Sequence, residues 1–472
     1  MTSFKFGRAF SLKALAAASV VALGTALGAA QGVHAESLND AIAMAYGQNP
    51  TLARARAQQR SNDENYVQTK SQFGPSVDAG ISTSYTDQDP FGQGRSNTSV
   101  SLSAQQTVFA SGGLTSSLRA SQANVMAGQQ DLRSTESSVL LNVIQVYTAV
   151  RRDQQALKIS QDNYDILKQQ LDQTQAQFDA GQLTRTDVAQ SQARLSQSAA
   201  SLAQAQAQLD SDRATYVSVV GQAPISLEPE PVLPGLPASF DDALAMAEKN
   251  NPDLQASFYA EDAAKARVKT ARAGYGPTVA LSAGMSDSAK TDNLTGLGDN
   301  TPVNATVRLS VPLYSSGLNS SRVRQASENY NAQKIQTEIT RRGVVSQVSQ
   351  SWSQMIAARS AVTSNEEQVR AAQVAAEGVK TEQQVGLRTN IEVLNAQQEL
   401  KSAQLQLLEA QRTQYVAASQ LLSVMGGMTA QAFVPNIEVY DPQQHFNDVK
   451  AKGWTPLEPV VHALDGLAAG GN

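Results

Sequence analysis

The chain is 472 residues long, carries a formal net charge of −5 and contains no cysteine. The acidic balance argues against nucleic acid as a partner, because nucleic-acid binding requires clustered Lys and Arg. A chain without cysteine forms no disulfide and accepts no lipid at an N-terminal cysteine. After residue 35 the histidines are His445 and His462, so we expect no catalytic centre, no metal site and no cofactor, and a protein that is not an enzyme.

The first 35 residues predict a secretory signal peptide. Three basic residues precede an apolar, uncharged stretch at residues 14–30, and Ala35 is a small residue suited to signal peptidase, so we expect the mature chain to begin at Glu36. An N-terminal membrane anchor is the alternative, but the stretch is rich in Ala and Gly and short for a span. No later run of about 18 apolar residues occurs, which excludes a helical membrane protein.

The rest of the sequence is a duplication. Residues 37–52 read SLNDAIAMAYGQNPTL, and residues 239–254, which begin 202 positions later, read SFDDALAMAEKNNPDL. After one loop the spacing becomes 205 positions and stays constant, pairing Gly112 with Gly317 and Gly181 with Gly386. A single change of spacing indicates two copies of one structural unit. The predicted organisation is a first repeat at 36–220, a proline-rich linker at 221–238, a second repeat at 239–425 and a C-terminal tail at 426–472.

Each copy contains segments that alternate between apolar and polar residues. The alternation is clear in residues 76–85 and 303–313 and is repeated near 100–104 and 279–285. A period of two over about ten residues is typical of a strand with one face in lipid and one face in a wet lumen. A small soluble β-subdomain with one solvated face is the alternative.

The ends of these strands favour the membrane interpretation. Aromatic residues lie at equivalent strand ends of the two copies, where they suit the membrane–water boundary: Phe73, Phe109, Tyr275 and Tyr314. The loops at residues 86–97 and 286–302 are polar and Gly-rich, like external loops of an outer-membrane barrel. One chain offers four strands, whereas membrane barrels need about eight or more, so several subunits must contribute strands.

The remaining segments predict long helices with a seven-residue repeat. One series is Leu157, Tyr164, Leu171 and Phe178; a second runs from Val188 to Tyr216; and the second copy keeps the register from Val362 onward. Such spacing favours a left-handed coiled coil. Because no proline occurs from about residue 116 to residue 178, we expect a helix roughly 90 Å long. Each copy is predicted to form an antiparallel helical hairpin, and a free-standing periplasmic coiled coil is the alternative.

The order of duplicated strands and hairpins, with G-x-x-T-x-x-D/E-V at the hairpin tips, resembles the TolC family of outer-membrane channels over essentially the whole mature chain. The resemblance implies an α+β membrane protein: a homotrimer whose twelve-stranded β-barrel, four strands per chain, continues into a long α-helical barrel in the periplasm. It further implies an exit duct for type I protein secretion or multidrug efflux, with a periplasmic adaptor protein, an inner-membrane ABC or proton-driven pump, and outer-membrane lipid as partners.

The same resemblance assigns a periplasmic gate to the hairpin tips. Thr186 and Asp187 match the family's Thr–Asp pair, Arg388 matches the arginine that links to them, and Glu392 matches an inward ring of carboxylates. Two positions depart from the best-known members: Gln383 replaces a tyrosine and Asn395 replaces an aspartate. Gly181 and Gly386 are the predicted tip turns. The alternative role for Asp187 and Arg388 is an ordinary solvated pair at a helix start.

Two functions compete at this point. The first is an export duct. It is expected to be passive, since the sequence contains no G-x-x-x-x-G-K-[ST] loop with which to use nucleotide. The second is a structural or adhesive coiled-coil trimer without a pore, which the strand alternation disfavours.

Overall fold

The computed structural model describes residues 36–87, 95–224, 226–291 and 301–469. The predicted signal peptide and most of the two predicted external loops lie outside the described residues. The description that follows concerns the compact unit that begins at Glu36. Within the described residues, no helix combines the length and the apolar character needed to cross a membrane.

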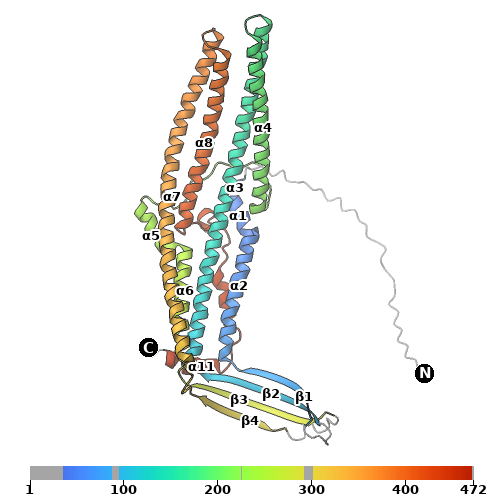
Figure 1. Ribbon diagram of the computed structural model, residues 1–472, viewed down its shortest axis with the longest axis vertical. Coiled ribbons are helices and arrows are strands. Elements are labelled where there is room, and N and C mark those ends of the chain that lie inside the picture. Colours follow the sequence, from blue (N-terminus) through green and yellow to red (C-terminus); the bar gives the residue numbers. More distant parts are fainter. Residues whose placement is uncertain (1–35, 88–94, 225, 292–300, 470–472) are drawn as a thin grey trace, which may run out of the picture. The chain divides into compact units, whose positions relative to one another are not determined.

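The same order of elements occurs twice (Figure 1). The first series is α1 (Leu38–Gln48), α2 (Pro50–Lys70), the short 3₁₀ turn η1 (Ser71–Phe73), β1 (Ser76–Thr86), β2 (Arg95–Phe109), α3 (Gly113–Asp179) and α4 (Arg185–Val220). The second is α5 (Phe240–Asn250), α6 (Pro252–Ala273), β3 (Thr278–Lys290), β4 (Val303–Ser310), α7 (Leu318–Gln384) and α8 (Asn390–Val424). The tail adds α9 (Ala430–Phe433), α10 (Pro442–Lys450) and α11 (Glu458–Ala469).

The repeated Asn-Pro dipeptide has one structural role in both series. The side chain of Asn49 accepts a hydrogen bond from the first turn of α2, and Asn251 does the same for α6, while the following proline occupies the first helical position. Each asparagine also donates to a carbonyl at the end of a long helix, Asn49 to Val219 (2.9 Å) and Asn251 to Val424 (2.8 Å). The short helices are thereby fixed to the hairpins.

The long helices pair as predicted. α3 and α7 each contain 67 residues, which corresponds to roughly 100 Å; α3 packs against α4, α7 packs against α8, and α3 also contacts α8. The seven-residue spacing is present in α3, but its most deeply buried line differs from the predicted series. Asp153, Ser160, Leu167 and Thr174 are buried, whereas Phe178 is exposed and Leu157, Tyr164 and Leu171 are half-buried. Small polar side chains on this line allow α4 and α8 to approach α3 closely.

The main hydrophobic core lies where the short helices meet the middle of the long ones. Its largest buried side chains include Tyr147, Tyr216, Ile42 and Leu421. The Tyr147 hydroxyl lies 2.9 Å from the carbonyl oxygen of Glu36 and 2.9 Å from that of Glu228. The segment at Glu36 and the inter-repeat linker are therefore both held by one buried tyrosine.

The tail packs on the first half of the chain. α10 lies along α2, where the His445 Nδ1 is 2.8 Å from a carboxylate oxygen of the buried Asp63 and the rings of Phe446 and Tyr66 meet edge to face. α11 continues to α3, β2 and η1. The tail is thus an integral part of the described unit.

The strands form one antiparallel sheet in the order β1-β2-β3-β4. Ser76 lies opposite Gln105, and Thr278 lies opposite Ser310, so the repeat spacings of 202 and 205 positions are reproduced in the strand register. β4 ends at Ser310, before the predicted limit at residue 313, because Pro312 has no N–H for the strand ladder. β1 and β4 are the edges, and each has a single neighbour within the described sheet.

Candidate gate and membrane-facing surface

One face of the sheet carries an apolar row that crosses all four strands. Residues directly opposite in an antiparallel pair point to the same side. One such row consists of Ala79, Leu102, Met285 and Val303, and the adjacent row on the other face consists of Asp78, Ser103, Gly284 and Asn304. Both rows cross the whole sheet, so the predicted alternation is a property of the assembled sheet and of each strand alike.

The apolar face is uncovered in the single chain. Ile81 is 76 % exposed and Val307 is 71 % exposed, and Val77 and Leu309 are similarly open. Contiguous exposed apolar surface of this kind marks contact with a membrane or with another protein. The sheet therefore presents a lipid-compatible face on one side and a polar face on the other.

The four predicted boundary aromatics occupy different environments. Tyr275 and Tyr314 are exposed, Phe109 is half-buried, and Phe73 is 1 % exposed. The ring of Phe73 lies against the ring of His462, with 5.7 Å between centroids. Phe73 therefore contacts the protein interior, which differs from the prediction, because the tail helix covers it. The boundary role of the other three stays a prediction.

The two hairpin tips share one backbone turn. Gly181 has φ +74° and Gly386 has φ +80°, and both follow the last turn of a long helix. The next residue closes the turn, with the Gln182 N–H donating to the Gln177 carbonyl at 2.9 Å and the Leu387 N–H donating to the Glu382 carbonyl at 2.9 Å. This is the Schellman arrangement, which requires a left-handed residue and so favours glycine.

Each tip then starts its second helix with a capping box. In the first tip the Thr184 hydroxyl donates to Asp187 at 2.6 Å, and in the second the Thr389 hydroxyl donates to Glu392 at 2.8 Å. Bonds from the Thr184 side chain and backbone lower the pKa of Asp187. The backbone N–H and hydroxyl of Thr389, followed by Arg388, lower the pKa of Glu392 to about 2. Both predicted gate carboxylates are thus fixed in position and ionised.

Arg388 is held between two carboxylates of its own tip. Its Nε lies 2.7 Å from Glu382 and its Nη1 lies 3.0 Å from Glu392, and all three side chains are about half-exposed. Glu392 and Arg388, two of the predicted gate residues, are therefore in direct contact. Thr186 is exposed at the first tip and Gln383 is half-buried at the second.

A buried polar network below the tips joins the two hairpins, and the sequence prediction did not include it. Gln170 of α3 donates to Asn390 of α8 at 2.9 Å, and Asn390 donates to Ser191 of α4 at 2.9 Å. Ser191 lies 3.4 Å from the hydroxyl of Thr174, and all four side chains are buried. Beside them Arg194 of α4 donates to Asn395 of α8 at 2.9 Å. Asn395 therefore links the hairpins of one chain.

Comparison with known proteins agrees with this geometry. The sequence profile described as outer membrane efflux protein matches residues 41–222 and again residues 243–427. The chain is 33 % identical over 442 residues to the outer membrane efflux protein BepC of Brucella suis biovar 1 (strain 1330), covering 93 % of this chain and 96 % of BepC. It is 26 % identical to the outer membrane protein TolC of Escherichia coli (strain K12), covering 90 % and 92 %.

The chain belongs to the outer membrane efflux protein family. The fold also matches the CmeC outer membrane channel of Campylobacter jejuni with a TM-score of 0.75 at 15 % identity, covering 89 % of this chain and 90 % of CmeC. The predicted family, its TolC-like fold and its outer-membrane location are thereby confirmed. Its relatives are outer-membrane efflux and secretion proteins, which confirms the predicted class of function.

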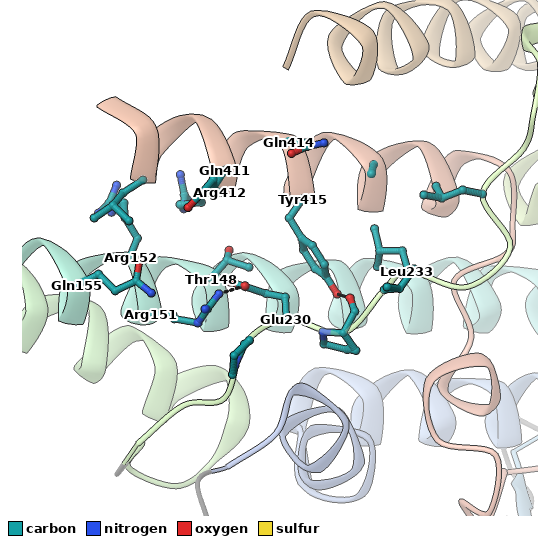
Figure 2. A pocket seen from close by; sticks show the side chains of 16 residues that line it. Thr148, Arg151, Arg152, Gln155, Glu230, Leu233, Gln411, Arg412, Gln414 and Tyr415 are labelled. Carbon is teal, nitrogen blue, oxygen red and sulfur yellow. Dashed lines mark hydrogen bonds and ion pairs between the residues drawn. The ribbon is translucent and has the colours of Figure 1, made fainter. Parts of the chain in front are cut away.

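In this member of the efflux family, the inter-repeat linker closes a cavity of about 470 Å³ between α3 and α8 (Figure 2). Glu230 of the linker pairs with Arg151 of α3, and the Tyr415 hydroxyl of α8 donates to the Pro231 carbonyl at 3.0 Å. Next to Arg151 in the sequence, Arg152 contacts Asp153. Burial, reinforced by Asp212, raises the pKa of Asp153 to about 6. The linker therefore ties the two hairpins together at mid-length.

Proposed function

We propose that three copies of this chain form a passive export duct in the outer membrane. Four strands from each copy close one twelve-stranded barrel, and the paired hairpins continue it as a helical barrel into the periplasm. The observation that carries the proposal is the sheet, which has an apolar row through all four strands on one face and, among the described residues, no neighbour on the outer side of either edge strand. Identical neighbours would pair with the free sides of the edge strands, and membrane lipid would cover the apolar face.

The hairpin tips are the proposed site of gating and of contact with partners. They carry exposed charged and polar groups on turns of defined geometry at the end of each hairpin. We expect a periplasmic adaptor and an inner-membrane ABC or proton-driven pump to bind there and to supply the energy. The fixed geometry of Arg388 and Glu392, the exposure of Thr186 and the partial exposure of Asp187 support this role.

Conductance in a planar lipid bilayer tests the proposed duct. The purified protein is expected to produce discrete current steps after insertion, because the polar face of the sheet lines a water-filled lumen. Membrane-bound protein that gives no current at any voltage or protein concentration would favour a structural trimer without a pore.

Replacing Arg388 with serine is expected to raise the mean single-channel conductance and the selectivity for cations. The change frees Glu382 and Glu392 from their shared guanidinium, which loosens the tip and leaves uncompensated negative charge near the entrance. Single-channel recording under a salt gradient measures both quantities.

The matched control for this change is Arg370→Ser. Arg370 lies on α7, which leads into the tip, and pairs with Glu367 at 2.9 Å within that helix, away from the tip. An Arg388→Ser channel that behaves like the Arg370→Ser channel would remove Arg388 from the gate.

Block by multivalent cations from the tip side is expected to persist at pH 4 and to weaken in Glu392→Gln at pH 4 and above. The Glu392 pKa is about 2, so its charge is retained well below the ordinary pKa of 4.5. Its capping contribution to stability is complete above pH 4.5 and is lost progressively as pH falls towards about 2. Titration of the block in bilayer recordings provides the measurement. A block that disappears between pH 5 and pH 4 would assign it to other carboxylates.

A further inference from the structure

The tail helix α11 crosses the end of the β1–β2 hairpin at which β1 begins and β2 ends. Thr455, just before the helix, fills the space in which a side chain at Gly74 would lie, and Ala469, at its end, fills the space at Gly112. Gly74 precedes β1 and Gly112 follows β2. The 12 residues of α11 therefore run from the start of one strand to the end of the next, as Figure 1 shows beside the ends of the strands and of α3.

One side of α11 is fixed to the protein by buried and charged contacts. Val461, Asp465 and Ala469 are buried. The Asp465 carboxylate accepts hydrogen bonds from the backbone N–H groups of Ala110, Gly112 and Thr115 at 2.8 to 2.9 Å. At the other end of the helix Glu458 pairs with Lys70 at 3.2 Å. The two acidic residues of α11 thus both lie on the attached side.

A second side of α11, continued by the residue before the helix, is an apolar stripe without a partner among the described residues. It consists of Leu457, Val460, Leu464 and Leu467, which are spaced three or four positions apart and are 43 to 80 % exposed. Trp454, 61 % exposed, lies just before the helix, and exposed Lys452 precedes it. An apolar helical stripe next to Trp and Lys is the composition of a helix that lies in a membrane interface.

The position of α11 places this stripe on the lipid side of the sheet. Gln106 lies opposite Leu281 and so shares the apolar face, yet it is buried, and its amide donates to the carbonyl of Phe73 in η1 at 3.2 Å. η1 therefore covers the foot of the apolar face. The ring of His462 in α11 stacks on Phe73 in turn, so α11 lies outside the sheet, at the level where the lipid-facing surface ends.

We propose that α11 is an interfacial anchor that binds the phospholipid leaflet at the periplasmic side of the outer membrane. The proposal rests on the proposed barrel. The stripe inserts among headgroups and the first acyl carbons, while Asp465 and Glu458 hold the helix against α3 and α2. A second copy of the chain is a poorer occupant, because four apolar side chains fall well short of the roughly 20 residues that each partner contributes to a stable interface. The contacts of α11 with β2 and η1 bring the helix next to the sheet that carries the exposed apolar face, which favours lipid.

Spin labels attached to the cysteine-free chain test the anchor. Leu467→Cys places a nitroxide on the stripe, Gln444→Cys places one on the exposed side of α10, and Ile81→Cys places one on the apolar sheet face. Each full-length variant is reconstituted in phosphatidylethanolamine–phosphatidylglycerol vesicles. Collisions of the label with oxygen, which concentrates in lipid, are compared with collisions with a water-soluble nickel chelate.

We expect the labels at 467 and 81 to meet oxygen far more often than the chelate, and the label at 444 to show the reverse. A label at 467 that is as open to the chelate as the label at 444 would place the stripe in water. A label at 467 that is shielded from both reagents would place it against protein. Either result with a lipid-exposed label at 81 overturns the anchor alone, whereas a water-exposed label at 81 overturns the barrel itself.

Discussion

Replacing Ile81 with arginine is expected to abolish insertion of the assembled protein into the outer membrane. Ile81 lies at the middle of β1 on the apolar face and is the most exposed large apolar residue of that strand. An arginine on the lipid side of a barrel strand near the bilayer midplane costs about 2–4 kcal/mol. Three copies around one barrel would cost roughly 6–12 kcal/mol, which is comparable to the whole stability of a folded domain.

The adjacent residue supplies the control for this prediction. Ser82 belongs to the polar face and contacts Ser99 across the strand pair, so Ser82→Arg directs the same charge into water. The quantity to measure is the fraction of protein recovered in the outer-membrane fraction as a heat-modifiable assembly. Equal recovery of the two variants would mean that the faces of the sheet are assigned wrongly.

Replacing Asp465 with alanine is expected to release the tail and to destabilise the first turn of α3. The N-cap of this 67-residue helix, Gly112, has φ +83° and no side chain to accept a hydrogen bond. The carboxylate of Asp465, 353 positions away from Gly112, takes the place of a capping side chain. It accepts hydrogen bonds from the backbone N–H groups of Ala110, Gly112 and Thr115. Leaving three largely buried N–H groups unpaired costs roughly 3–6 kcal/mol, and the favourable charge at the positive end of the helix is also lost.

Hydrogen exchange at residues 110–116 and the temperature of subunit dissociation report this effect. Asp465→Asn keeps one acceptor oxygen without the charge, so we expect it to fall between the wild type and Asp465→Ala. Asp448→Ala removes an exposed carboxylate from α10 and serves as the matched control. Unchanged exchange at residues 110–116 in Asp465→Ala would show that water replaces the carboxylate at no cost.

The features that the sequence predicts well are those written in local spacing. A period of two identified the strands, a period of seven with no proline identified the long helices, and the recurrence of Asn-Pro and of the tip glycines identified the duplication. Each of these patterns is decided by residues within a few positions of one another. The repeat boundaries at 36–220 and 239–425 and the roles of the gate residues in a trimer stay predictions.

The features that the sequence did not predict depend on distant contacts. Asp465 and the start of α3, and His445 and Asp63, lie more than 340 positions apart, and no spacing rule joins them. Phe73 lies at a strand end, as a boundary aromatic would, but the C-terminal tail buries it. The tail has no counterpart in the first repeat, so the repeat pattern does not reveal this contact. The buried seam of α3 carries polar residues at a spacing of seven positions or its multiples, such as Ser160 and Thr174. This weak pattern was outweighed by the series of larger Leu and Tyr side chains.

The internal repeat also predicts how neighbouring copies pair. Within the chain Ser103 of β2 lies opposite Gly284 of β3. Advancing the first residue by 205 positions and moving the second back by 202 gives Arg308 of β4 and Ser82 of β1. If each subunit continues the sheet of the next with the same register, Arg308 lies opposite Ser82 of the partner subunit, and both face the lumen.

Disulfide cross-linking across this pair is the most direct test of a barrel shared between chains. The natural chain has no cysteine, so the double variant Ser82→Cys with Arg308→Cys contains a single intended pair. Mild oxidation in the membrane is expected to yield a covalent ring of three chains on a denaturing gel, and to do so more readily than the shifted pair Ser84→Cys with Arg308→Cys. A membrane-inserted double variant that remains monomeric after oxidation, with both thiols free, would contradict the shared barrel.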